Sequence, residues 1–252
     1  MQEETREALA KVPAVTLGFW VIKILATTLG ETGGDAVTMS LGLGYLLGTA
    51  IFMALFVATI GAQIRARRFH AALYWLAIIA STTVGTTLAD FCTRSLGIGY
   101  AGGSALLALA LVSTLWLWQH TLGSVAVTSV SSPRAEAFYW LTIMFSQTLG
   151  TALGDWTADS AGLGYLGGAA IFTALLVLVA LALGLTRISR TVLFWCAFVL
   201  TRPLGAVVGD FLDKPLAQGG LALSRYAASA ALLALIALAV AALPQRAASK
   251  AH

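Results

Sequence analysis

Long apolar segments separated by short polar links run along almost the whole chain. Each segment is about as long as the roughly 20 residues that an α-helix needs to cross a bilayer core of about 30 Å. The segments are too long for membrane β-strands, and their polar positions do not alternate. The pattern therefore predicts eight transmembrane helices, over residues 13–34, 42–63, 70–90, 98–118, 137–155, 163–185, 191–210 and 218–243.

The eight segments form four similar pairs. A Trp, nine residues, a Gly, four residues and an Asp recur in this order four times without a gap. The repeated residues are Trp20, Trp75, Trp140 and Trp195, then Gly30, Gly85, Gly150 and Gly205, then Asp35, Asp90, Asp155 and Asp210. The intervals between successive Trp residues are 55, 65 and 55 residues. Such self-similarity indicates tandem structural units, with an insertion between the second and the third.

The repeat also predicts how the chain is divided. We expect an N-terminal segment (1–12), repeat 1 (13–63), repeat 2 (70–118), a linker (119–136), repeat 3 (137–185), repeat 4 (191–243) and a tail (244–252). In the first three units a G-x-G-Y motif follows the Asp and ends at Tyr45, Tyr100 and Tyr165, whereas the fourth unit departs from it. Because each unit crosses the membrane twice, all four have the same orientation, around an axis along the membrane normal.

This arrangement resembles a bacterial family of membrane-anchored proteins that consist of four tandem two-helix repeats of unknown function, each with a characteristic Trp. The resemblance rests on the repeated Trp, Gly and Asp positions and covers about residues 15–240. It implies an all-α integral membrane fold with eight transmembrane helices. It implies no activity, so the function is argued from the residues.

Composition supports a membrane protein. Hydrophobic residues make up 59% of the 252 residues and charged residues only 10%, against about 25% charged residues in soluble domains. The mean hydropathy is +0.87. These values exclude a soluble globular domain and an intrinsically disordered chain. The net charge of +4 indicates topology in such a protein, and we expect no nucleic-acid partner.

The distribution of Lys and Arg predicts the orientation. One face of the predicted bundle carries Arg6, Lys11, Arg65, Arg67, Arg68, Arg134, Arg187, Arg190, Arg246 and Lys250. The other face carries only Arg94 and Lys214. By the positive-inside rule, both chain ends lie in the cytoplasm. We therefore expect a multi-pass protein of the bacterial inner membrane, with the four repeated aspartates near the outer face.

Polar residues form a stripe on the first helix of each unit. Positions four residues apart lie on one helical face, and counting back from each Asp gives polar side chains. The stripes consist of Asp35, Glu31, Thr27 and Lys23; Asp90, Thr86 and Thr82; Asp155, Thr151 and Gln147; and Asp210 and Arg202. A charged residue at the centre of a span costs at least about 2.5–3.5 kcal/mol, so it normally faces the interior and marks function. Four such stripes around an axis predict a polar path that opens at the outer face.

The acidic stripes favour a cation as the ligand. Carboxylate oxygens suit hard divalent ions, and clustered carboxylates need a cation or bound protons. We interpret the chain as a small secondary transporter for a cation, with manganese or magnesium as candidates and proton exchange as a coupling mode. Asp35, Asp90, Asp155 and Asp210 are the candidate ligands. Glu31 assists them, the Thr and Gln residues and Lys23 line the path, and Arg202 balances charge or gates.

Each of these features also has a structural interpretation. The aspartates fit an interfacial role at the start of short loops, and Arg202 fits an ion pair that holds two helices together. Lys23 could reach the cytoplasmic interface, and Arg225 could pair with Asp210 or Asp213. The glycines suit close helix packing, and the Trp and Tyr sets, which lie near opposite interfaces, suit aromatic belts better than a ligand cage.

Two further classes of function remain as alternatives. A membrane scaffold or binding subunit explains the glycines and the acidic residues equally well, and it predicts a sealed core. An intramembrane enzyme is disfavoured because the chain has no recognisable nucleophile, and ATP-driven pumping is disfavoured because it has neither a phosphate-binding loop nor a nucleophile elbow. We therefore expect no enzymatic activity and no cofactor other than a bound divalent cation. The partners expected are the lipid bilayer and a small cation, and no oligomeric state follows.

Overall fold

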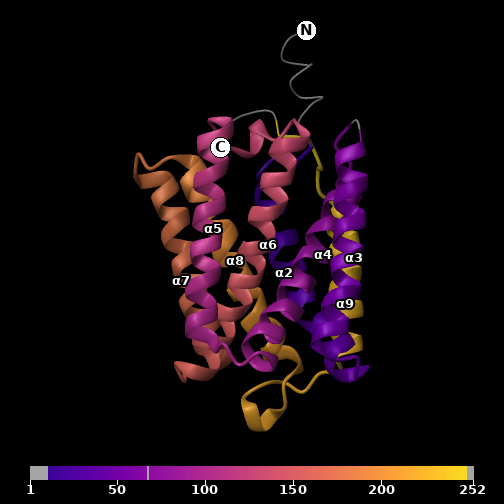
Figure 1. Ribbon diagram of the computed structural model, residues 1–252. Helices are drawn as coiled ribbons and strands as arrows, with labels where there is room; N and C mark the ends of the chain where they lie inside the picture. Colours follow the sequence, from indigo (N-terminus) through magenta and orange to yellow (C-terminus); the bar gives the residue numbers. More distant parts are fainter. Residues whose placement is uncertain (1–10, 67, 249–252) are drawn as a thin grey trace.

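The computed structural model describes residues 11–66 and 68–248 and is helical throughout this part of the chain (Figure 1). Its α-helices are α2 (Leu17–Asp35), α3 (Gly44–Arg65), α4 (Ala71–Asp90), α5 (Tyr100–Leu122), α6 (Pro133–Asp155), α7 (Gly164–Leu185), α8 (Arg190–Asp213) and α9 (Arg225–Ala242). The described residues contain no β-strand, only an isolated bridge between Pro13 and Ala247. Most of the expected N-terminal segment (1–12) and the last four residues of the expected tail (244–252) lie outside the described residues.

The repeat motif after each Asp has a structural cause in the first three units. A π-helical turn follows Asp35, Asp90 and Asp155, and these turns are η1 (Ala36–Ser40), η2 (Phe91–Ser95) and η4 (Trp156–Ser160). The two glycines of the G-x-G-Y motif then adopt positive φ angles, which are +68° and +73° at Gly42 and Gly44. Only glycine adopts this conformation without a steric penalty. In the fourth unit, a loop with the short helix η5 (Leu216–Gln218) takes the place of this turn.

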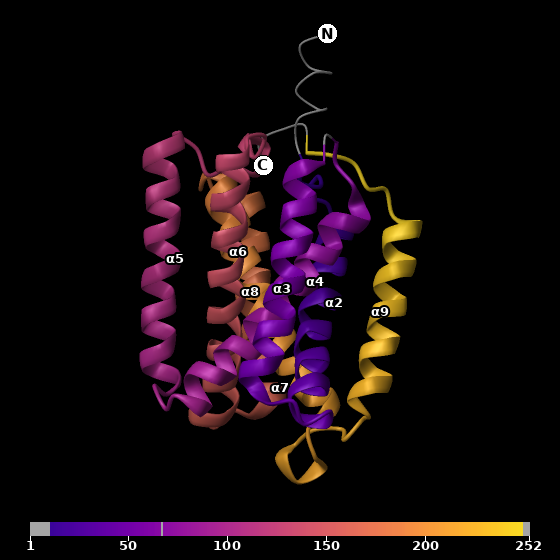
Figure 2. The same ribbon diagram turned by 45° about the vertical axis from the view of Figure 1, so that its right-hand side comes forward.

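The first helices of the four units form an inner ring. Helices α2, α4, α6 and α8 each pack against two neighbours, and α8 closes the ring by packing against α2. The second helix of each unit lies outside, on the inner helix of the next unit: α3 on α4, α5 on α6, α7 on α8 and α9 on α2. Figure 2 shows the outer helices α5 and α9 on opposite flanks of this bundle. Neighbouring units are therefore interlocked around the whole ring.

Six of the eight helices are long and apolar enough to cross a membrane: α3, α4, α5, α7, α8 and α9. Helices α2 and α6 are not among them: α2 carries Lys23, Glu31 and Asp35, and the middle of α6 contains Gln147 and several Ser and Thr residues. In the most apolar stretch of each outer helix, only 11–22% of the residues are buried inside the protein. The apolar surface of these helices therefore faces outward. These helices are compatible with a multi-pass membrane protein, whereas the count of eight spans stays a prediction.

The repeated Trp residues do not form the predicted aromatic belt. Trp75, Trp140 and Trp195 are buried, and only Trp20 is partly exposed. The Trp side chains pack against other aromatic side chains inside the inner ring of helices. Together these side chains form what we call the aromatic cluster. Its other members are Phe19, Tyr74, Tyr139 and Phe194. Phe19, Tyr74, Tyr139 and Phe194 each directly precede a repeated Trp. The belt prediction was wrong because a position near a helix end is compatible with either an inward or an outward orientation.

The two ends of the described chain meet beside the aromatic cluster. The Ala14 amide donates to the Arg246 carbonyl at 2.8 Å, and the Ala248 amide donates to the Val12 carbonyl at 2.9 Å. These bonds tie the segment before α2 to the segment after α9. Figure 1 shows this end of the bundle at the top. We call it the terminal end, and we call the opposite end, where the repeat aspartates lie, the loop end.

Candidate functional site

The polar stripes of the four inner helices all lie inside the ring, where they form one continuous set of side chains. Every member is at most 4% exposed. This set, called the polar column below, consists of Lys23, Thr27, Glu31, Asp35, Thr82, Thr86, Asp90, Gln147, Thr151, Asp155, Arg202 and Asp210. Buried polar groups in this number need partners inside the ring, because an unpaired one is costly.

The repeated glycines allow the inner helices to approach one another closely. A methyl group at any of them would overlap a residue of the polar column on the neighbouring helix. The four pairs are Gly30 with Thr82, Gly85 with Gln147, Gly150 with Arg202 and Gly205 with Thr27. At Gly85, for example, an added Cβ would lie 2.8 Å from the backbone carbon of Gln147. The same contact therefore recurs at each of the four helix pairs and closes the ring.

Arg202 lies at the centre of the polar column and connects the other three inner helices. Its Nη2 donates to Glu31 Oε2 at 2.9 Å, to Thr86 Oγ1 at 2.6 Å and to Thr151 Oγ1. Arg202 is fully buried, and Glu31 is 3% exposed. Nε and Nη1 of Arg202 make no hydrogen bond within the described residues, and the same is true of both amide atoms of Gln147. The ion pair is thus formed, but the guanidinium group keeps unused donors in a buried place.

Lys23 lies one level closer to the terminal end and is also fully buried. Its amine donates to Thr201 Oγ1 at 3.3 Å and lies 4.1 Å from the centroid of the Phe198 ring. The interfacial position considered for this side chain is therefore wrong, because the amine points into the ring. Thr201 also accepts a bond from Thr27 Oγ1 on its carbonyl oxygen at 3.2 Å. Lys23 consequently helps to join α2 to α8.

The four repeat aspartates are joined in pairs by two cationic side chains. Arg94 lies 2.7 Å from Asp90 through Nε and 3.7 Å from Asp155 through Nη2. Lys214 contacts Asp35, and its Nζ lies 3.1 Å from Asp210 Oδ1. We call these two contacts the aspartate bridges. The aspartates are buried and paired, so an interfacial capping role does not describe them.

Lys214 lies just beyond α8, and two opposing effects determine its pKa. Burial lowers the pKa of the amine, but the carboxylates of Asp210 and Asp35 outweigh burial and raise it above the ordinary lysine value. Lys214 therefore stays protonated at physiological pH. Arg225 lies beside this bridge, 2.9 Å from Asp213 and 3.7 Å from Asp35. Of the two partners considered for Arg225, the structure selects Asp213.

The aspartate bridges show a two-fold pattern within the four-fold ring. Arg94 follows Asp90 by four residues, and Lys214 follows Asp210 by four residues. The equivalent positions in the first and third units hold Met39 and Asp159. Each bridge therefore begins in an even-numbered unit and reaches the Asp of the next unit. This alternation agrees with the 55, 65, 55 spacing of the repeats.

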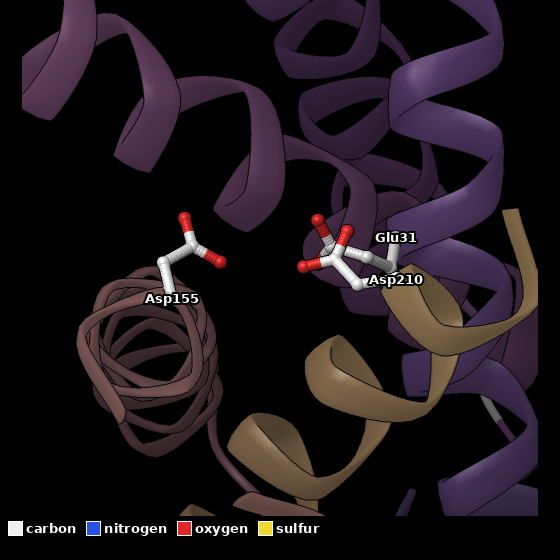
Figure 3. Close-up of side chains that lie close together, drawn as sticks. All are labelled: Glu31, Asp155 and Asp210. Atoms are coloured by element: carbon white, nitrogen blue, oxygen red, sulfur yellow. The ribbon is translucent and has the colours of Figure 1, made fainter. Parts of the chain in front are cut away.

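Three carboxylates of the column lie close enough together to share one ion. Oxygens of Glu31, Asp155 and Asp210 are all within 4.8 Å of one another. Figure 3 shows Asp155 on one side, facing Glu31 and Asp210 on the other. We call this group the carboxylate triad. Oxygens of Asp35, Asp210 and Asp213 form a second such group, whereas Asp90 belongs to neither group among the described residues.

The polar column borders a cavity at the loop end, where Asp210 lines it. A cavity of about 600 Å³ lies at the loop end, and we call it the vestibule. Its lining residues are Met39, Tyr45, Arg94, Asp159, Tyr165, Asp210, Lys214, Pro215, Gln218 and Arg225. At the terminal end the aromatic cluster fills the ring, and the hydroxyl groups of Tyr74 and Tyr139 lie 2.6 Å apart. The arrangement suits a site that is reached from the loop end and closed at the terminal end.

Four important residues were not recognised from the sequence as part of the site. Arg94 and Lys214 were counted only as outer charges, and Thr201 and Asp213 were given no role or only that of a partner. The spacing of four residues after Asp90 and Asp210 was a usable signal for the two cations, because such pairs lie on one helical face. No signal indicated that each cation also contacts the next unit.

Comparison with known families gives one result. The model of the family described as Repeat of Unknown Function (DUF347) matches residues 18–69, 73–123, 138–189 and 193–245. The four matches coincide with the four two-helix units of the structure. No curated protein and no solved structure gives a significant match.

Proposed function

The chain belongs to the Repeat of Unknown Function (DUF347) family, and from the carboxylates inside its inner ring we propose that it is a small secondary transporter for a cation. The observation that carries this proposal is the carboxylate triad. Glu31, Asp155 and Asp210 place their oxygens within 4.8 Å of one another in the buried polar column. Like charges at this distance repel strongly in a medium of low dielectric constant, so cationic side chains, a bound cation or bound protons must offset them.

The balance of charges around the triad supports a cationic ligand. Six carboxylates in this region are ion-paired: Glu31, Asp35, Asp90, Asp155, Asp210 and Asp213. Within the part of the chain that the structure describes, they pair with four cationic side chains: Arg94, Arg202, Lys214 and Arg225. These ion-paired groups therefore include two more carboxylates than cations, whereas Lys23, which lies one level deeper in the polar column, forms no ion pair among the described residues. One divalent cation, or two protons, would neutralise the difference.

A divalent metal ion such as manganese or magnesium is the cargo that this donor set favours. The triad offers only carboxylate oxygens, which are the ligands that hard cations prefer. The hydroxyl groups of Thr86 and Thr151 lie beside the triad through their bonds to Arg202. Exchange with protons follows naturally, because the same two-charge deficit accepts either one ion or two protons. No chemical reaction and no further cofactor is assigned to the chain.

The transport route proposed runs from the vestibule through the polar column to the terminal end. In this conformation the aromatic cluster blocks the second half of the route. Transport therefore needs a second conformation in which the loop end closes and the terminal end opens. The excess of Lys and Arg at the terminal end supports a cytoplasmic position for that end in a bacterial inner membrane. The vestibule would then face outward.

Cation binding by the triad can be tested with the purified protein. We expect one divalent cation to raise the apparent unfolding temperature, since a ligand that binds only the folded state stabilises it by about 2.7 kcal/mol at one hundred times its dissociation constant. The shift should disappear in Asp155→Asn and in Asp210→Asn. Uptake of that ion into liposomes should be lost in the same two variants.

Asp159→Asn is the matched control. Asp159 also lines the vestibule, but it is exposed and belongs to neither carboxylate group. This variant should keep both the thermal shift and the uptake. Folded Asp155→Asn and Asp210→Asn proteins that retain full uptake would exclude the triad as the ion site.

One observation favours a non-transporting scaffold or binding subunit as the second candidate. Each carboxylate of the triad already has a cationic side chain within 4 Å: Arg202, Arg94 or Lys214. A scaffold needs no more than such internal pairing. This alternative predicts that no cation shifts the unfolding temperature and that no ion crosses a liposome membrane.

A further inference from the structure

The two aspartate bridges lie at two of the four contacts between inner helices. One bridge joins Asp90 and Arg94 to Asp155, across the contact of α4 with α6. The other joins Asp210 and Lys214 to Asp35, across the contact of α8 with α2. Among the described residues, no ion pair joins repeat aspartates across the contacts of α2 with α4 or of α6 with α8. The loop end of the ring is thus tied at two opposite places.

The aspartate bridges lie between two groups of packed helices. Helices α3 and α9 pack on α4 and α2, and helices α5 and α7 pack on α6 and α8. The chain passes from the first group to the second directly after Arg94 and returns directly after Lys214. Both cationic residues therefore lie where the groups are connected, at the rim of the vestibule that both residues line.

We propose that Arg94 and Lys214 are the gate residues of the polar column: each is a tethered cation that occupies a pair of repeat aspartates until a transported cation replaces it. Two members of the carboxylate triad, Asp155 and Asp210, are held by these two residues. An ion that binds the triad from the vestibule must displace the guanidinium or ammonium group from them. The identity of the displacing ion rests on the proposed function, whereas the closing of the loop end by the bridges does not.

The charges of the bridges also determine which cations can open the gate. A side chain that is covalently tethered beside its carboxylates has a high effective concentration. A monovalent ion offers the same charge as the side chain it must displace and gains little. A divalent ion interacts twice as strongly with each carboxylate. The gate residues therefore favour divalent over monovalent cations, and replacing them with neutral residues should weaken this selectivity.

Access to the polar column measures the gate without any assumption about the cargo. Ala206 is fully buried on α8, between the levels of Arg202 and Asp210. In a protein whose free cysteines Cys92 and Cys196 have been replaced by alanine, Ala206→Cys provides a single probe. A water-soluble thiol reagent should label this probe slowly. In Arg94→Met, Lys214→Met and the double variant, we expect labelling to be faster by about tenfold or more, because closed states lose a stabilising contact.

Two kinds of control separate gating from a general loss of stability. Arg225 lines the same vestibule, but it contacts only one repeat aspartate, Asp35. In Arg225→Met, labelling of the cysteine probe should therefore stay slow. Lys214→Arg and Arg94→Lys keep the charge and should restore slow labelling. Unfolding temperatures identify any variant that has lost its fold, and each single variant is informative by itself. Unchanged labelling in folded Arg94→Met and Lys214→Met proteins would overturn the proposal.

A second readout concerns the cargo. Lys214→Met should lower the divalent-ion concentration needed for half-maximal thermal stabilisation by about tenfold, and sodium ions should begin to stabilise the variant. If labelling accelerates but no cation stabilises any protein, the gate is supported and the transport proposal fails. If divalent ions stabilise the wild type but neither labelling nor ion affinity changes in the variants, the triad binds an ion and the gate proposal fails.

Discussion

Arg202 and Glu31 show how charged side chains are accommodated inside an apolar bundle. Each of the two would be strongly disfavoured alone in this position, because a buried unpaired charge costs several kcal/mol. Together they form an ion pair at 2.9 Å, and Thr86 donates a further bond to Glu31 at 3.3 Å. The pair joins α8 to α2 at the centre of the polar column. Each side chain therefore stabilises the folded protein mainly because it neutralises the buried charge of the other.

This condition leads to a prediction at the scale of single residues. Arg202→Leu should lower the free energy of unfolding by about 3–5 kcal/mol, because it leaves the Glu31 carboxylate buried without a cation. Arg202→Leu combined with Glu31→Leu should recover much of that loss. Denaturant titrations of the two single variants and the double variant in detergent give the coupling energy. Additive losses would show that the two side chains act independently.

At the scale of elements, the repeated glycines specify the contacts between inner helices. Gly30 and Gly33 provide a matched comparison within α2. A methyl group at Gly30 would overlap the side chain of Thr82 and approach its backbone carbon to 3.0 Å, whereas at Gly33 the nearest atoms lie 3.9 Å away. The difference arises because only Gly30 faces the next inner helix at close range.

Alanine replacements test this distinction. Gly30→Ala should destabilise the folded protein by about 1–3 kcal/mol through overpacking. Gly33→Ala should be neutral or stabilising by up to about 1 kcal/mol, because alanine is the better helix former. Thermal unfolding in detergent measures both effects. Equal behaviour of the two variants would contradict the close-packing role of the repeated glycines.

The elements and their repetition were predictable, whereas their partners were not. Apolar length and the Trp, Gly and Asp spacing indicated eight helices in four units, because both features are local in the sequence. The rotation of each helix about its own axis was harder to predict from the sequence. The Trp residues were assigned to the membrane surface, although three of them are buried. The stripe of Asp35, Glu31 and Lys23 was easier to interpret, because charge makes an outward orientation expensive.

The candidate site shows the same limit. The sequence identified the carboxylates, but it did not show that Glu31 joins Asp155 and Asp210 in one group while Asp90 stays outside it. Nor did it show that Lys214 bridges to Asp35, which is 179 residues away. Contacts of this kind depend on which inner helices are neighbours in the ring. One-dimensional spacing carries no information about that choice.

At the scale of the whole molecule, the ring is closed both by its helices and by its chain ends. Helix α9 packs on α2, so the last unit covers the first as each unit covers the next. The segments around Val12 and Ala248 are hydrogen-bonded to each other at the terminal end. Lys11 adds an ion pair to Glu136 of α6 at 2.8 Å. The opening between residues 248 and 11 is therefore only one of several similar openings of a closed ring.

This closure predicts that the chain tolerates circular permutation at the terminal end. We join residue 248 to residue 11 by a short Gly/Ser linker and open the chain between α7 and α8, within residues 186–189. This connection is exposed and lies at the same end as residues 11 and 248. The permuted protein keeps every contact between the described helices, and the terminal end loses only Arg6 and Lys250 of its Lys and Arg residues, so it should insert normally and remain monodisperse. Its unfolding temperature should stay close to that of the original chain.

The matched control opens the chain at the loop end instead, within residues 161–163 between η4 and α7. New ends there would lie on the opposite membrane face, and α7 would become the first helix to insert, with its flanking charges reversed relative to the chain start. This permutant should insert poorly or aggregate. If both permutants fail while the original chain folds, ring closure does not make the openings equivalent, and the order in which the units are synthesised must contribute to assembly.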